Sequence, residues 1–114
     1  MPPPISLAEL EAKLIARTPN GSRVVRTMEE AEGVRFLCPL CFHRNGGAVG
    51  THAVICWGPT VPAAIEPGPG RWTLAGTSIA DLTLNGALGK SRSVLLTSGC
   101  GWHGYVTNGR ATDT

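Results

Sequence analysis

The hydrophobic pattern of the first twenty residues predicts a short amphipathic helix. Leu7, Leu10 and Leu14 are spaced at i, i+3 and i+7, which places them on one face of a helix. Ser6 followed by Glu9 three residues later is a capping-box pattern that starts a helix. We therefore predict a helix over Leu7–Arg17, ended by the breaker sequence at 18–21. On this basis residues 1–21 form an N-terminal helix and linker.

After residue 21 the helical period is replaced by short apolar runs separated by turn residues, which is typical of β-strands. Asn108-Gly109, between two such runs, predicts a hairpin with a type I′ turn. Gly58–Gly70 contains four prolines and three glycines and predicts an irregular loop. The expected strands are 22–27, 34–37, 52–57, 71–74, 79–84, 93–97, 103–107 and 110–112. The predicted fold class is mainly β (α+β), with residues 22–114 forming the β domain of a single globular unit.

The composition indicates a single small domain and gives no sign of a nucleic-acid-binding or membrane-spanning protein. At 114 residues the chain is the size of one domain, and 16% charged residues is low against about 25% in soluble proteins. A net charge of +2 gives no strong nucleic-acid signal, and no apolar run is long enough for a membrane span. The first residues show no secretory signal, so we expect a cytoplasmic protein whose thiols stay reduced. In the reducing cytoplasm, cysteines are more often metal ligands than members of disulfide bonds.

The cysteines and histidines form two knuckle motifs. Cys38 and Cys41 are separated by two residues, and so are Cys100 and His103, with 58 residues between the two motifs. Two residues between ligands allow one turn to direct both side chains at one ion, and two such turns supply the four N/S ligands of tetrahedral zinc. We predict a structural zinc ion at Cys38, Cys41, Cys100 and His103. Each motif follows an apolar strand candidate, so the ion would tie two parts of the sheet together.

Alternatives to this ligand set stay open. The thiols could hold no metal, or His52, His43 or Cys56 could replace one ligand. His43 lies too close to the first knuckle to share its ion comfortably, and Cys56 lies in an apolar run that reads as strand core. A site with four protein ligands has no position for an activated water, and no nucleophile elbow or partnered acid accompanies Ser93. The sequence therefore favours a non-enzymatic protein.

Three of the six aromatic residues are tryptophans, namely Trp57, Trp72 and Trp102. All three lie near the ends of predicted strands, and Trp102 lies within the second knuckle. Core packing is one explanation. The other is a shared aromatic pocket for a small ligand, in which these three residues would be the ligand-binding residues.

The pattern over Gly33–Gly109 resembles a group of small proteins of unknown function that are common in bacteriophages and prophages. The segment 98–109, SGCGWHGYVTNG, is the most characteristic part. Further residues that carry the resemblance are FLCPLC at 36–41, NGG at 45–47, GTH at 50–52, ICW at 55–57 and GRW at 70–72. The resemblance implies a phage origin and a metal site, but no reaction.

The two knuckles around a β region also resemble the β-tent arrangement. It is shared by methionine sulfoxide reductase B, the cereblon ligand-binding domain and Yippee-like proteins. In these folds two knuckles pin two antiparallel sheets with one zinc ion, so the resemblance implies the same architecture here. Cys100–Gly109 is similar to the second-knuckle segment, with a histidine as the last ligand. The reductases carry a nucleophilic cysteine beyond that knuckle, and this chain has no cysteine after Cys100.

Three functions follow as expectations. The leading one is a phage-encoded, zinc-stabilised protein that binds a protein partner, either a virion component or a host factor. The second is a small-molecule binding module built on the tryptophans. The third is a metal-dependent enzyme, which would need an open zinc position or a reactive Cys56. The near-neutral charge argues against DNA coating, and the sequence predicts no oligomeric state.

Overall fold

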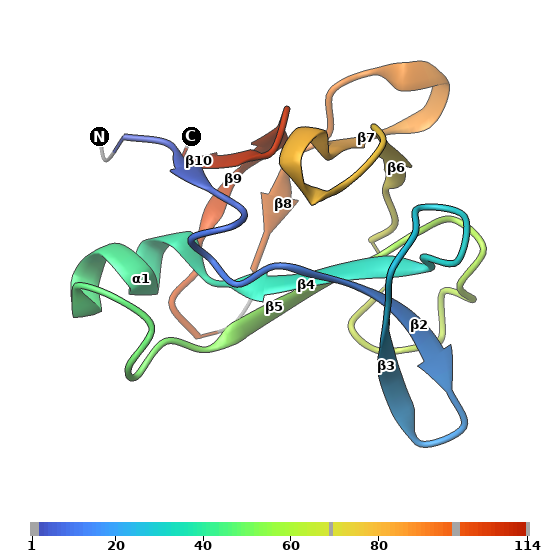
Figure 1. The fold of residues 1–114 in the computed structure, drawn as a ribbon, viewed down its shortest axis with the longest axis horizontal. Coiled ribbons are helices and arrows are strands. Elements are labelled where there is room, and N and C mark those ends of the chain that lie inside the picture. The colour runs from blue at the N-terminus through green and yellow to red at the C-terminus, as the bar shows by residue number, and fades with distance from the viewer. Residues whose placement is uncertain (1–2, 69, 97–98, 114) are drawn as a thin grey trace.

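The fold was analysed in a computed structural model that describes residues 3–68, 70–96 and 99–113. Within these residues the protein is mainly β, as predicted, with three antiparallel sheets and one α-helix (Figure 1). None of the helices in these residues is long and apolar enough to cross a membrane.

Two four-stranded sheets form most of the structure. The first sheet has the order β3-β2-β4-β5, with strands Gly21–Val25, Lys13–Thr18, Gly33–Leu37 and Ala53–Trp57. The second sheet has the order β1-β10-β9-β8, with strands Ile5–Ser6, Arg110–Asp113, His103–Thr107 and Val94–Leu95. The remaining elements are the pair β6 (Thr73–Ala75) and β7 (Thr83–Asn85), the helix α1 (Pro39–Asn45), and two short 3-10 turns at Ile79–Asp81 and Ala87–Gly89. The β2–β3 hairpin extends away from the second sheet (Figure 1).

The predicted N-terminal helix is wrong. Ser6 does cap a turn, since its Oγ accepts a hydrogen bond from the Glu9 N–H at 3.2 Å, but Glu11 has a φ of +54° and the turn goes no further. Leu7 and Leu10 are both fully buried in the core. Lys13–Thr18 is the inner strand β2, paired on both sides. A short isolated helix is marginal in water, and pairing with two strands stabilises the extended form instead.

Most of the predicted strands are confirmed, with small shifts at their ends, and residue 97 of the predicted strand 93–97 lies outside the described residues. Asn108 and Gly109 have φ values of +49° and +77°, which matches the type I′ turn predicted between β9 and β10. The strand expected over 79–84 is divided, because the Asp81 carboxylate accepts hydrogen bonds from the Thr77 and Ser78 N–H groups and caps a 3-10 turn. Only β7 then continues as a strand.

A single cluster of buried residues joins the two sheets. Phe36 from β4 and Trp102 from just before β9 are each 1% exposed, and their rings meet edge to face at 6.0 Å. Val54, Cys56 and Val106 are buried in the same cluster. Cys56 is the core residue expected from its apolar run, and burial raises the pKa of its thiol above the ordinary value. The metal-ligand candidates lie at one end of this shared core.

Gly104 marks the tightest packing in the second sheet. A Cβ at this position would overlap the Thr112 carbonyl oxygen of the paired strand and come within 2.8 Å of the Trp102 ring. We predict that Gly104→Ala lowers the free energy of unfolding by about 3 kcal/mol. Chemical denaturation in zinc-saturated buffer measures this. Thr107→Ala, at an exposed position of the same strand, is the control, and an equal effect of the two variants would contradict the packing argument.

Candidate metal centre

The first knuckle joins the end of β4 to the start of α1. Cys38 is the N-cap residue, and its N–H donates to the His52 carbonyl at 2.9 Å, which holds it against the start of β5. Pro39 suits the first position of a helix because its fixed φ is already helical and its missing N–H is not needed there. Cys41 follows within the first turn. The knuckle is therefore the entry to a helix, where the sequence predicted a simple turn.

The other two ligand candidates come from separate segments. His52 directly precedes β5 and lies opposite Cys38, which directly follows the neighbouring strand β4. Cys100 lies in the connection between β8 and β9, which the Leu96 N–H closes by donating to the Trp102 carbonyl at 2.9 Å. Gly99 and Gly101 on either side of Cys100 have φ values of +68° and +70°, a conformation that glycine adopts readily.

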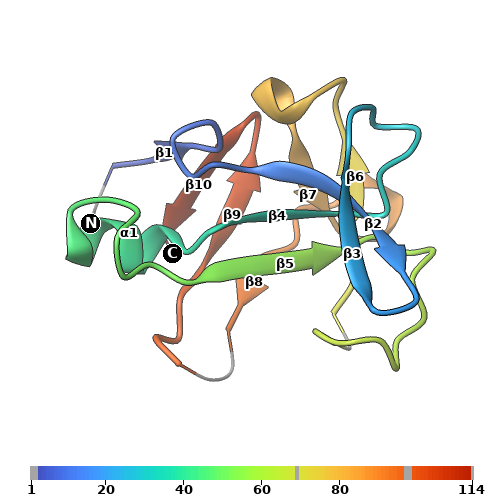
Figure 2. The same ribbon diagram turned by 60° about the horizontal axis from the view of Figure 1, so that its bottom comes forward.

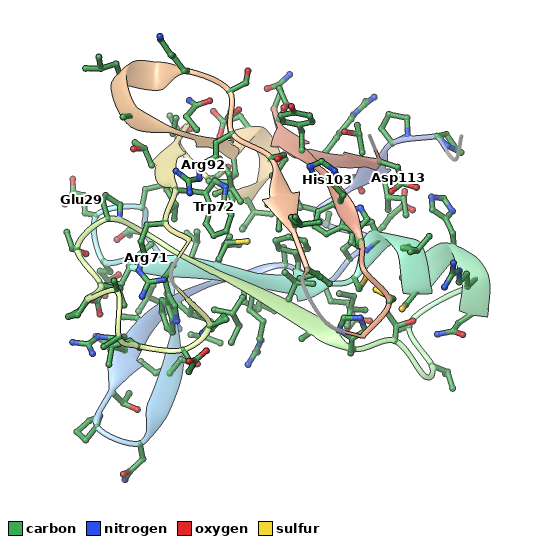
Figure 3. All side chains as sticks on the ribbon, turned by 180° about the vertical axis from the view of Figure 1, so that it is seen from behind. Glu29, Arg71, Trp72, Arg92, His103 and Asp113 are labelled. Carbon is green, nitrogen blue, oxygen red and sulfur yellow. The ribbon has the colours of Figure 1, made fainter. Side chains whose placement is uncertain are left out.

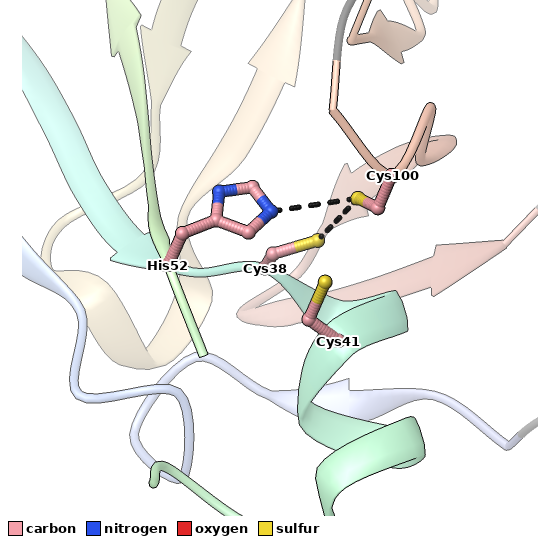
Figure 4. A group of neighbouring side chains, drawn as sticks. All are labelled: Cys38, Cys41, His52 and Cys100. Atoms are coloured by element: carbon pink, nitrogen blue, oxygen red, sulfur yellow. Dashed lines mark hydrogen bonds between the residues drawn. The ribbon is translucent and has the colours of Figure 1, made fainter. Parts of the chain in front are cut away.

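The side chains of Cys38, Cys41, His52 and Cys100 converge on one point (Figure 4). Their ligand atoms all lie within 4.8 Å of one another, so they can hold a metal ion. The Cys100 Sγ lies 3.4 Å from both the Cys38 Sγ and the His52 Nε2. Ligand atoms around a tetrahedral zinc ion are about 3.5–3.8 Å apart, given the usual Zn–S and Zn–N distances. Three sulfurs and one imidazole nitrogen are also the donor set that zinc prefers.

The His52 ring is oriented for this role by its second nitrogen. Nδ1 lies 3.3 Å from the Ala53 carbonyl oxygen. Because a carbonyl oxygen only accepts hydrogen bonds, this contact suits a ring that carries its proton on Nδ1 while Nε2 binds a metal ion. Without a metal, an Nε2–H can instead donate to the Cys100 Sγ. Metal-bound histidines commonly have such a partner for their other ring nitrogen.

The structure differs from the predicted ligand set at His103. His103 is the first residue of β9, and its side chain is exposed while Trp102 before it is buried. Alternate residues of a strand face opposite sides, so His103 points away from the core end where the sulfurs meet. Its Nε2 lies 2.9 Å from the Ser93 Oγ. His52, predicted only as an alternative, joins the three cysteines instead.

The three thiols differ in their electrostatics. Burial raises the pKa of Cys38 to about 12 and also raises the pKa of Cys41. At Cys100 burial opposes ionisation, but hydrogen bonds from His52 and from the Trp102 backbone outweigh it and lower the pKa to about 7. In the metal-free protein Cys100 is therefore the first thiol to ionise.

The three tryptophans do not share one pocket. Trp57 and Trp102 are 3% and 1% exposed, and their indole N–H groups donate to the Glu66 carbonyl and the Asp113 carboxylate, both at 2.9 Å. Trp72 alone lines a cleft of about 690 Å³ that also reaches the metal-ligand candidates Cys41, His52 and Cys100. The Arg92 guanidinium lies over the Trp72 ring at 5.8 Å (Figure 3). Core packing therefore accounts for two of the three.

Comparisons with protein-family models, with curated proteins and with solved structures find no match to this chain.

Proposed function

We propose that Cys38, Cys41, His52 and Cys100 bind one structural zinc ion, and that the protein is a non-enzymatic binding protein stabilised by it. The observation that carries the proposal is the convergence of four N/S donors from three separate segments. Two of these segments flank strands of the first sheet and the third connects strands of the second. An ion at this point would cross-link the two sheets at one end of their shared core, as in the β-tent arrangement that the sequence resembles.

A structural role suits the donor set better than a catalytic one. Four protein ligands complete the tetrahedron and leave no position at which the metal could activate water. The spare thiol Cys56 is fully buried with a raised pKa, so it is a poor nucleophile. These features support binding, not catalysis, as the activity of the protein.

The resemblance to small phage proteins, together with the near-neutral charge, supports a phage-encoded protein that binds a virion component or a host factor in the cytoplasm. Affinity capture of the tagged protein from infected cells, followed by reconstitution with the purified candidate, tests this. We expect one protein to be retained and to bind the purified zinc-loaded chain at a fixed ratio. Absence of any such protein at every stage of infection would contradict the proposal.

Zinc affinity is expected to fall as the pH falls. In the metal-free protein the raised pKa values keep Cys38 and Cys41 protonated near neutrality, so zinc must displace at least two protons. The dissociation constant should therefore rise about a hundredfold from pH 8 to pH 7, and more steeply below the Cys100 pKa of about 7. Competition with a chelating dye measures the slope. Cys56→Ala should leave it unchanged, and a dissociation constant independent of pH would contradict thiolate ligation.

A further inference from the structure

The cleft beside the metal centre lies between two open sheet edges. β5 is the outermost strand of the first sheet and β8 is the outermost strand of the second. Residues of both strands line the cleft, including Ile55 of β5 and Leu95 of β8. An outermost strand has one side on which its main-chain groups have no ladder partner. In the view of Figure 2, β8 is seen just below β5.

The hydrogen-bond pattern shows which groups of β5 face outward. The bond from the Cys38 N–H to the His52 carbonyl fixes the phase of the β4–β5 ladder, in which alternate residues face the partner strand. By this alternation Val54 turns its main-chain groups toward β4, and Ile55 turns its N–H and C=O away from it. Neither group of Ile55 has a hydrogen-bond partner among the described residues.

β8 also has main-chain groups that face outward from its sheet. The bond from the Leu96 N–H to the Trp102 carbonyl fixes the phase of the β8–β9 ladder. Val94 then faces β9, and Leu95 turns its N–H and C=O away from it, likewise without a partner in the described part of the chain. The Leu95 side chain is 57% exposed, so a partner can reach it.

The chain itself shows how the gap between the two edges is spanned. The Trp72 N–H donates to the outward-facing Trp57 carbonyl of β5 at 3.1 Å, and the Trp72 indole N–H donates to the outward-facing Ser93 carbonyl beside β8 at 3.2 Å. One residue therefore bonds to both edges and closes one end of the cleft. The metal-ligand candidates lie at the other end. Between these ends, the outward main-chain groups of Ile55 and Leu95 have no partner among the described residues.

We propose that an extended peptide segment of a partner protein enters this cleft and pairs with the main-chain groups of Ile55 and Leu95, continuing the bridge that Trp72 begins. The inference rests on the proposed function, since it names the binding surface of a protein that acts by binding. Strand addition of this kind takes its affinity from main-chain hydrogen bonds and its specificity from alternate side chains. The metal centre would hold the two edges at a fixed separation, because its ligands flank β5 and follow β8.

The lining indicates which side chains the peptide carries. Val54, Ile55, Val94, Leu95 and Leu96 make the middle of the cleft apolar. At the Trp72 end the exposed Arg92 guanidinium is held over the ring, and no carboxylate pairs with it among the described residues. We therefore infer an extended segment with alternate apolar residues and a carboxylate that meets Arg92.

A library of capped seven-residue synthetic peptides tests the proposal, with the full-length zinc-loaded chain as the probe and the affinities of bound peptides remeasured in solution. Leu95→Pro removes the outward N–H without removing a ladder hydrogen bond, and Leu95→Thr is the matched control that keeps the N–H. We expect bound peptides with alternate apolar residues and an acidic residue. Leu95→Pro, or N-methylation of alternate peptide bonds, should weaken binding about tenfold or more, whereas Leu95→Thr should not. Arg92→Gln should weaken only the acidic peptides.

The outcomes separate this inference from the proposed function. No bound peptide, or binding unaffected by Leu95→Pro and by N-methylation, would overturn strand addition. Binding of small apolar molecules in place of peptides would overturn it as well. If a captured partner protein binds the Leu95→Pro variant with unchanged affinity, the proposed function is supported and only this cleft is rejected as the binding surface. Thermal melting of each variant with zinc shows that it is folded, and Arg92→Gln provides a second test should Leu95→Pro fail to fold.

Discussion

Removal of the proposed zinc ion is expected to separate the two sheets and unfold most of the protein. Structural zinc contributes about 10–16 kcal/mol in small domains, against a total stability of about 5–15 kcal/mol for a typical domain. In this chain the ligands connect segments that belong to different sheets. Cys38→Ser is expected to lower the free energy of unfolding by about 5 kcal/mol or more, because Cys38 is the buried member of the proposed ligand set. Chelation of the natural protein should have a similar effect, followed by circular dichroism and zinc content.

The matched control for Cys38→Ser is Cys56→Ala. Both cysteines are fully buried in the same core, but only Cys38 lies in the metal-ligand group. Cys56→Ala should retain one zinc ion per chain and lose only about 1 kcal/mol, the cost of a small cavity. If Cys38→Ser were no more harmful than Cys56→Ala, or if the chelated protein kept its melting temperature, the ion would have no structural role.

The second large effect is expected at Arg71. Its guanidinium donates to five backbone carbonyls and so holds the loop at 58–70 together. The acceptors are those of Val61, Pro62, Ile65, Pro67 and Gly70. Arg71→Ala would leave these carbonyls without that donor, and we expect a loss of about 3 kcal/mol in the free energy of unfolding. Denaturant titration with tryptophan fluorescence measures it, since Trp57 bonds to the same loop at Glu66.

Two further variants separate geometry from charge at this loop. Arg71→Lys keeps the charge but not the planar fork of donors, so it should recover less than half of the lost stability. Arg92→Ala removes an exposed arginine whose guanidinium lies over the Trp72 ring, and it should cost less than about 1 kcal/mol. Full recovery by lysine would show that the charge matters more than the hydrogen-bond pattern.

The strands could be predicted because their signals are local. The short strand candidate over 103–107 and the Asn108-Gly109 turn specify a hairpin without help from the rest of the chain. The N-terminal segment could not be predicted in this way. Its leucines fit a helical face, yet Leu14 belongs to a strand whose two partners lie further along the sequence. Pairing with strands that are distant in sequence produces no hydrophobic pattern within the segment, so the strand could not be predicted from the segment alone.

The candidate metal-binding site likewise contains residues that local sequence predicts and residues that depend on strand pairing. Cys38 and Cys41 are brought together by local geometry, and the spacing of the motif alone predicted them as ligands. The choice between His52 and His103 depends on strand pairing. His52 lies beside the sulfurs because the antiparallel β4–β5 ladder sets it opposite Cys38, whereas His103 begins a strand with its side chain turned outward. The five carbonyls around Arg71 come from a loop without periodicity, so no sequence pattern indicated that role.

X-ray absorption at the zinc edge, on the natural protein and on two histidine variants, tests the central claim most directly. The account predicts one zinc ion per chain bound by three sulfurs at about 2.3 Å and one nitrogen at about 2.0–2.1 Å. His52→Ala should remove the nitrogen from the coordination shell, and His103→Ala should leave the spectrum unchanged. A spectrum altered by His103→Ala and not by His52→Ala, or the absence of zinc from the purified natural protein, would contradict it.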